Sequence, residues 1–215
     1  MKLLTRIILI LVLSWILSPT GWAKTDVKEA VVKIFTDRDR YDYEKPWQKM
    51  RIENATGSGF IISGKRILTN AHVVADEDFI QVRKAGDAKK YIAEVEAESH
   101  QSDLATLKIC EDGFISDLYN LKVAEDAFFS GVNPIELGNS AKIGDRVTIY
   151  GFPRGGEELS IKEAQIYRIE HAIYSHPFGH SLLYKIDKPI IGGNSGGPVL
   201  KDNRLVGVAF QSGTT

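Results

Sequence analysis

The chain has 215 residues, of which 43% are hydrophobic and 26% are charged, which is the ordinary range for a folded globular protein. Its 27 basic residues are balanced by 28 acidic ones, and the formal net charge is -1. Without a basic excess, we expect neither nucleic acid nor anionic lipid as a partner. The sequence has no phosphate-binding Gly-x-x-x-x-Gly-Lys-Ser/Thr loop, so we do not expect it to use ATP.

The N-terminal segment has the features of a secretory signal. Two basic residues, Lys2 and Arg6, come before an apolar run at residues 7–17. The segment ends on Gly-Trp-Ala at 21–23. A basic start, a short apolar stretch and a small-x-small ending predict a signal peptide over residues 1–23, cut after Ala23. The apolar run is shorter than the about 20 residues that span a bilayer, so membrane attachment is expected only if the segment stays uncleaved. We therefore expect an exported protein, either periplasmic or secreted.

The rest of the chain consists of short apolar or alternating runs separated by turn residues. No helical periodicity is sustained over three turns, and the pattern predicts an all-β sandwich or a pair of β-barrels. The less regular stretch 111–139 is expected to connect two halves. Strands are expected at residues 31–35, 59–63, 66–69, 79–83, 91–97, 104–110, 146–150, 161–169, 182–186, 197–200 and 205–210.

A serine flanked by glycines stands out in the second half, where residues 192–198 have the sequence Gly-Gly-Asn-Ser-Gly-Gly-Pro. Glycines leave the hydroxyl of Ser195 unobstructed and let consecutive backbone N–H groups converge on one point. Acyl transfer needs that arrangement, because the hydroxyl attacks a carbonyl carbon and the N–H groups of Gly193 and Ser195 would hold the developing oxyanion. The alternative is a plain turn of Gly, Ser and Asn.

A histidine and an aspartate in the first half are candidates to complete such a site. His72 follows the expected strand 66–69, where it is a candidate general base. Asp103 opens the expected strand 104–110, where a carboxylate can orient an imidazole through its Nδ1–H. Taken singly, each residue more often has a structural role. Together with Ser195 they supply a nucleophile, a base and an orienting acid.

These residues occur along the chain in the order His, Asp, Ser, which is the order of the chymotrypsin-like proteases. The chain resembles the HtrA (Deg) branch of that family in the segments Gly-Ser-Gly-Phe-Ile-Ile at 57–62, Leu-Thr-Asn-Ala-His at 68–72, Ser-Asp-Leu-Ala at 102–105 and Gly-Asn-Ser-Gly-Gly-Pro at 193–198. Gly-Phe-Pro at 151–153 resembles a further turn of the family. Pro-Trp-Gln at 46–48 and the run 206–212 resemble its plant-type Deg subgroup. The resemblance extends from about residue 31 to the end.

The resemblance implies an all-β, chymotrypsin/trypsin-like fold of two six-stranded antiparallel barrels. The first barrel is expected over about 27–112 and the second over about 134–215, within a trypsin-like serine protease domain at 24–215. Relatives continue with one more barrel strand and PDZ domains, so we expect the second barrel to be truncated at its C-terminus and no PDZ domain to be present. The implied activity is that of a serine endopeptidase, with the catalytic residues His72, Asp103 and Ser195 and an oxyanion hole at Gly193 and Ser195.

The resemblance also places a substrate pocket in the residues just before the nucleophile and in the last strand. These residues are Pro189, Ile190, Gly192, Phe210, Gln211 and Ser212. None of them is acidic, so we expect a preference for small or medium apolar side chains rather than Arg or Lys. No cofactor and no metal is expected, because His176 and His180 lack a nearby cysteine or acidic cluster. The acidic pair at 157–158 is interpreted as part of a solvated loop.

Two functions from different classes remain open at this point. The first is an ATP-independent endopeptidase that hydrolyses exported, unfolded or damaged polypeptides. The alternative is a non-catalytic chaperone-like or peptide-binding protein on the same fold. Related proteases usually form trimers through aromatic N-terminal contacts, and Tyr41, Tyr43 and Trp47 are candidates for such a homotrimer, with ordinary packing as the alternative.

Overall fold

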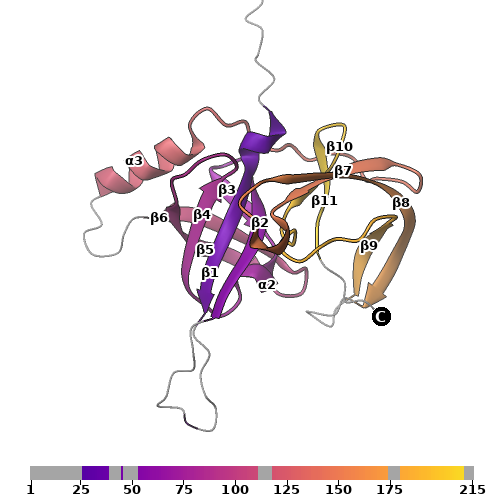
Figure 1. Cartoon of the computed structure of the whole chain (residues 1–215), viewed down its shortest axis with the longest axis horizontal. Helices are drawn as coiled ribbons and strands as arrows, with labels where there is room; N and C mark the ends of the chain where they lie inside the picture. The colour runs from indigo at the N-terminus through magenta and orange to yellow at the C-terminus, as the bar shows by residue number, and fades with distance from the viewer. Residues whose placement is uncertain (1–25, 39–44, 46–52, 111–117, 174–179, 211–215) are drawn as a thin grey trace, which may run out of the picture.

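The computed structural model describes residues 26–38, 45, 53–110, 118–173 and 180–210. Strands dominate, and they form two β units that lie beside each other, the first in indigo to magenta and the second in orange to yellow (Figure 1). Within these residues no helix is long and apolar enough to cross a membrane. The expected signal peptide at 1–23 lies outside the described residues, as do Tyr41, Tyr43 and Trp47.

The first unit is a closed antiparallel barrel in the strand order β1-β2-β3-β6-β5-β4. It closes because β1 pairs with strands on both of its sides, so that Ile34 lies opposite Gly57 on one side and Val82 on the other. Apolar side chains fill the interior, with Ile34, Phe60 and Ile67 fully buried. The strands are β1 (Val31–Arg38), β2 (Glu53–Ile62), β3 (Arg66–Thr69), β4 (Glu77–Lys84), β5 (Tyr91–Ser99) and β6 (Leu104–Cys110).

Two short helical turns flank this barrel. The 3-10 turn η1 (Val27–Ala30) leads into β1, and the side chain of Asp26 caps it by accepting a hydrogen bond from the Lys28 amide. The single helical turn α2 (Ala71–Val74) follows β3 and buries Val73 and Val74. Since α2 starts two residues after β3 ends, the place of His72 is set by the end of that strand.

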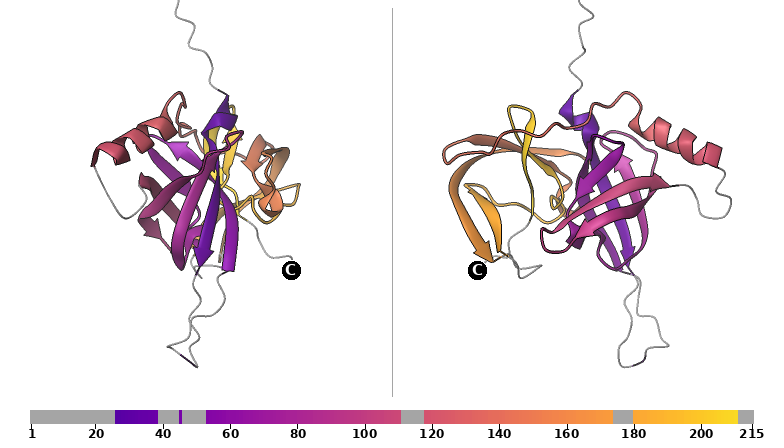
Figure 2. Two further views of the ribbon diagram at one scale, coloured as in Figure 1. Left: turned by 60° about the vertical axis from the view of Figure 1, so that its left-hand side comes forward. Right: turned by 180° about the vertical axis from the view of Figure 1, so that it is seen from behind.

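The second unit is a sheet of five strands in the order β11-β10-β7-β8-β9, curved into a half-barrel (Figure 2). Its strands are β7 (Arg146–Gly151), β8 (Ser160–Ile173), β9 (His180–Ile186), β10 (Pro198–Lys201) and β11 (Arg204–Val208). The 3-10 turn η2 (Pro153–Gly155) directly follows β7. A closed barrel beside a half-barrel sheet confirms the predicted all-β, two-barrel class of fold.

The packing joins the two units. The second sheet has a small hydrophobic core of its own, which contains Val147, Ile149 and Ile166. The larger core fills the first barrel and continues into the second half through Phe152 and Leu200. The loops after β7 and before β10 are therefore positioned by both units.

One expectation about secondary structure was wrong. The stretch 111–139 was expected to be an irregular connection, but it contains the twelve-residue helix α3 (Leu118–Phe129), which lies against the outside of the first barrel (Figure 1). Apolar residues occur nearly all round this helix, so its sequence has no distinct apolar stripe and no clear helical period. Phe128 fixes the helix, because its fully buried ring packs edge-on against Tyr91 with the ring centroids 5.0 Å apart.

Candidate active site

A histidine and an aspartate meet at one end of the first barrel. Strands β3 and β6 are paired with Thr69 opposite Ala105. His72 lies just beyond the end of β3, and Asp103 lies just before the start of β6. This register brings the two side chains together, with His72 Nδ1 2.7 Å from Asp103 Oδ2.

The carboxylate of Asp103 is held in a single orientation. Oδ1 accepts a hydrogen bond from the backbone amide of His72 at 2.9 Å, while Oδ2 faces the ring nitrogen. Asp103 is only 3% exposed and has a φ of 50°, a left-handed conformation that Asp tolerates better than most residues. The side-chain Nδ2 of Asn70 donates to the Asp103 carbonyl at 2.8 Å and secures the turn. Because a carboxylate only accepts hydrogen bonds, Nδ1 of His72 carries a proton and Nε2 of the neutral ring is left as the acceptor.

The backbone of His72 is fixed by a residue that the sequence analysis did not select. The guanidinium of Arg38, at the end of β1, donates to the carbonyl of His72 at 2.7 Å and to that of Val73 at 3.0 Å. The hydroxyl of Thr36 donates to the same Val73 carbonyl at 3.0 Å. One turn of helix cannot hold itself in place by its own hydrogen bonds, so these donors from β1 stabilise α2 in its position.

Ser195 lies in a loop that packs against the same end of the barrel. Ser195 is only 8% exposed, and its backbone carbonyl accepts a hydrogen bond from the Ser58 amide at 2.8 Å. The neighbouring Gly196 lies so close to β3 that a Cβ added there would collide with Thr69 and lie 3.2 Å from the Asn70 amide. The structure thus brings the serine loop to the segment that immediately precedes His72.

The peptide groups around Ser195 have a defined direction. In a trans peptide the carbonyl and the following N–H point to opposite sides. The carbonyl of Gly192 accepts from the Arg154 amide at 2.6 Å, and that of Asn194 accepts from the Gly197 amide at 2.9 Å. Both carbonyls are turned into the protein, so the N–H groups of Gly193 and Ser195 point away from these partners, as the donors of an oxyanion hole require.

Ser58 links the first barrel to this loop, and sequence reasoning assigned it no role. Its hydroxyl donates to the Gly193 carbonyl at 2.7 Å and accepts from the Phe152 amide at 3.0 Å. Its own carbonyl accepts from the hydroxyl of Thr69 at 2.8 Å. One buried serine therefore connects the nucleophile loop, the loop after β7 and strand β3. The position of Ser58 between two glycines, just before the apolar run at 60–62, was the available signal.

The loop after β7 carries a carboxylate, Glu157, that is paired with two cations of the first barrel. Glu157 is exposed, as expected, but its carboxylate also accepts from Lys33 at 2.7 Å and lies 2.5 Å from the guanidinium of Arg83. The hydrogen bonds from Lys33, which has the larger effect, and from Arg83 lower the pKa of Glu157 to about 2. The carboxylate is therefore ionised at any pH near neutrality, although its side chain is 68% exposed.

The expected pocket residues are only partly within the described residues. Gly192 borders the serine loop, and Ile190 is half-buried against the core of the second sheet. Pro189 is exposed, with its carbonyl accepting from the Lys162 ammonium at 2.7 Å, and Phe210 is half-buried. Gln211 and Ser212 lie outside the described residues, so the composition of the pocket stays a prediction.

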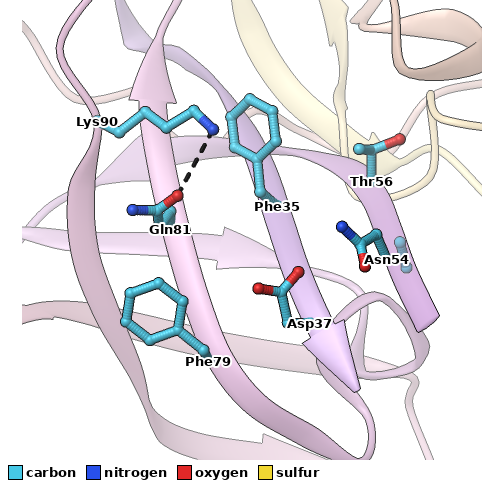
Figure 3. A pocket seen from close by; sticks show the side chains of 8 residues that line it. Phe35, Asp37, Asn54, Thr56, Phe79, Gln81 and Lys90 are labelled. Atoms are coloured by element: carbon cyan, nitrogen blue, oxygen red, sulfur yellow. Dashed lines mark hydrogen bonds between the residues drawn. The ribbon is translucent and has the colours of Figure 1, made fainter. Parts of the chain in front are cut away.

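A separate hollow of about 250 Å³ lies on the outer face of the first barrel (Figure 3). Phe35, Phe79 and Lys90 are among its lining residues, and it shares none with the candidate site. In the part of the chain that the structure describes, no group of three or more His, Cys, Asp or Glu side chains is arranged to hold a metal ion. His176 lies outside that part.

Substitution of Gly196 by alanine is expected to destabilise the fold by roughly 3 kcal/mol. Gly196 has a φ of 85°, and an added Cβ would collide with the carbonyl of Ser58 and the hydroxyl of Thr69. Gly86→Ala is the matched control, because Gly86 has a φ of 78° and nothing lies within 4 Å of its added Cβ. This variant should lose only about 1 kcal/mol of unfolding free energy, which is the cost of placing alanine in the left-handed conformation. Urea unfolding of both variants checks this, and equal losses would contradict the proposed close packing.

Comparison with known proteins places this chain in a peptidase family. Residues 57–208 match the family described as "Trypsin-like peptidase domain". Protease Do-like 4, mitochondrial, of Arabidopsis thaliana is 41% identical over 182 residues, which are 85% of this chain and 32% of that protein. Protease Do-like 2, chloroplastic, of the same plant is 37% identical over 183 residues, which are 85% of this chain and 28% of that protein.

A solved structure supports the same likeness in three dimensions. The active form of the Rv3671c protease from M. tuberculosis superposes with a TM-score of 0.64 at 27% identity, covering 86% of this chain and 70% of that chain. The chain spans about a third of the length of the two plant relatives.

Proposed function

Since the chain belongs to the HtrA/Deg-type serine proteases with a trypsin-like peptidase domain, we propose that it is a serine endopeptidase with Ser195, His72 and Asp103 as its catalytic triad. The observation that carries the proposal is the meeting of the His72–Asp103 pair and the Ser195 loop at the end of β3. The carboxylate of Asp103 is oriented by two bonds to His72, which leaves Nε2 as the basic nitrogen of the ring.

The proposed reaction follows from these positions. Nε2 of His72 takes the proton of the Ser195 hydroxyl as Oγ attacks the carbonyl carbon of the scissile peptide. The N–H groups of Gly193 and Ser195 donate to the oxyanion of the tetrahedral intermediate. The intermediate collapses as His72 returns the proton to the leaving amine, which leaves an acyl group on Oγ. A water molecule, deprotonated by His72, then attacks this ester; His72 gives the proton to Oγ as the carboxylic acid product leaves, which restores the serine.

We also propose polypeptides as the substrates, in particular unfolded or damaged exported chains, cleaved after small or medium apolar residues. The absence of an acidic residue among the six expected pocket positions supports the apolar preference. Export to the periplasm or the exterior is proposed from the basic start, apolar run and small-residue ending of segment 1–23. The homotrimer likewise remains a proposal, which sedimentation of the purified chain can check.

The proposed function is tested by mapping the adduct of a fluorophosphonate probe, whose phosphorus is attacked by an activated serine with loss of fluoride. Tryptic cleavage after Lys185 and Lys201 releases a peptide in which Ser195 is the only serine, because the bond before Pro189 resists trypsin. We expect one adduct, carried by this peptide in the native 215-residue chain and lost when the chain is first unfolded in urea. A folded chain without this adduct would contradict the proposal and favour the non-catalytic alternative.

A further inference from the structure

Lys33 is a buried lysine on the strand that faces the second unit. Lys33 is only 1% exposed and lies in β1 between two apolar neighbours. A charged ammonium is rarely buried without compensation, because removing it from water costs several kcal/mol. A buried lysine therefore indicates specific partners, and neither the triad nor the oxyanion donors account for it.

Both partners of Lys33 belong to the loop that follows β7. Its ammonium donates to the carbonyl of Gly155 at 2.7 Å and to Oε1 of Glu157 at 2.7 Å. Arg83 binds the other oxygen of the same carboxylate, and the ring of Phe35 lies 4.6 Å from the ammonium. Glu157 thus supplies the negative charge that compensates the buried cation, and the carbonyl of Gly155 supplies a second acceptor.

The loop held by Lys33 is conformationally strained. Arg154 has a φ of 55° and Gly155 a φ of 66°, so two consecutive residues are left-handed. A non-glycine residue in this region costs about 1 kcal/mol or more, and such a conformation persists only where surrounding contacts determine it. Besides the hydrogen bonds within the turn itself, the contacts include the bond of Lys33 to the Gly155 carbonyl and the bond from the Phe152 amide to Ser58.

This strained loop touches the peptide that would bind the oxyanion. The amide of Arg154 donates to the Gly192 carbonyl at 2.6 Å. A Cβ added to Gly193 would lie 2.8 Å from the Arg154 nitrogen and 3.1 Å from that of Gly155, so the two loops are in direct contact. Because Gly192 and Gly193 are both glycines, only such contacts determine which way their shared peptide faces.

We propose that Lys33 is a positioning residue: its ammonium clamps the loop 153–157, and this loop keeps the Gly192–Gly193 peptide in the orientation that presents the Gly193 N–H to substrate. The proposal rests on the proposed function for its kinetic consequence, and on geometry alone for the order of the loop. The chain of contacts runs from Lys33 to Gly155, from Arg154 to Gly192, and so to Gly193. Lys33 itself touches neither substrate nor the triad residues.

The test is Lys33→Met, which keeps an unbranched apolar stem, shorter by one atom, and removes the ammonium. With a fluorophosphonate probe, we expect the inactivation rate constant to fall about tenfold, as when the competent arrangement drops to about a tenth of the molecules. The concentration of probe at half-maximal rate should stay unchanged. Hydrogen exchange followed by mass spectrometry should accelerate in peptides covering residues 152–157 and 192–197, with the remaining strands as protected as in the wild type.

The matched control is Lys108→Met. Lys108 also forms an ion pair, with Glu94 at 2.6 Å, but it is 51% exposed on the outside of β6. The Lys108→Met variant should leave both the rate of inactivation by the probe and the hydrogen exchange unchanged. If Lys33→Met does not fold, Glu157→Ala removes the compensating carboxylate from an exposed position and should accelerate exchange in the same two segments.

The outcomes separate the two proposals. A folded Lys33→Met chain with wild-type exchange at 152–157 and 192–197 would overturn the inference, whatever the enzyme does. Faster exchange confined to these segments, with no labelling of even the wild type, would support the clamp and contradict the proposed function. Faster exchange throughout the barrel would assign Lys33 a general structural role and overturn the inference as well.

Discussion

Replacement of Ser195 by alanine is expected to lower the rate of peptide-bond hydrolysis by about a million-fold. The substitution removes Oγ, so no acyl-enzyme forms, and only stabilisation by the oxyanion donors and substrate binding remains. The fold should be unaffected, because Ser195 is tied to the first barrel through its backbone carbonyl, which alanine retains. Initial rates of release from fluorescein-labelled casein, at equal concentrations of folded protein, measure the effect.

The matched control for this variant is Ser63→Ala. Ser63 is exposed in the turn between β2 and β3 and is not a candidate site residue. This variant should cleave casein at the wild-type rate. A Ser195→Ala chain that keeps more than a small fraction of the activity would show that the hydrolysis has another source and would end the case for Ser195.

Replacement of Asp103 by asparagine is expected to lower kcat by about ten thousand-fold with little change in KM. Asp103 uses both oxygens on His72, one on the backbone amide and one on Nδ1. Asparagine has one oxygen, and if it keeps the backbone amide, its NH2 group faces Nδ1. Nδ1 must then accept, so the ring proton moves to Nε2, which can no longer take the proton of Ser195.

Asp202→Asn is the control for this tautomer argument. Asp202 has a φ of 52°, close to the 50° of Asp103, but it lies exposed in the turn between β10 and β11. Both variants make the same chemical change in the same backbone conformation, so any effect on kcat that they share does not come from the imidazole. Equal kcat values for Asp103→Asn and the wild type would contradict the assigned role of Asp103.

The sequence predicted the strands and the three candidate catalytic residues because each has a local signal. Eleven expected strands are present, and those at Arg66–Thr69 and Leu104–Cys110 have the expected bounds. His72 and Asp103 flank these two strands, so their meeting needed only the pairing of β3 with β6. Ser195 was marked by its glycines.

The supporting residues could not be predicted in the same way. Arg38, Ser58 and Lys33 act on partners that lie 34, 135 and 122 residues away in the chain. Nothing in the neighbourhood of Lys33 distinguishes it from a lysine on the solvent face of a strand. Its burial arises from the docking of a loop from the other unit, and a period-of-two pattern contains no information about that contact.

The wide separation of Lys33 from the loop it binds has a consequence for how the chain acquires its fold during synthesis. All six strands of the first barrel precede the loop at 153–157, so the barrel can close while that loop is still unmade. At that stage the ammonium of Lys33 keeps its water. Arrival of the Gly155 carbonyl and the Glu157 carboxylate replaces this water with protein acceptors. Docking of this loop therefore dehydrates a single cation of the first barrel, and the proposed orientation of the Gly192–Gly193 peptide depends on the same docking.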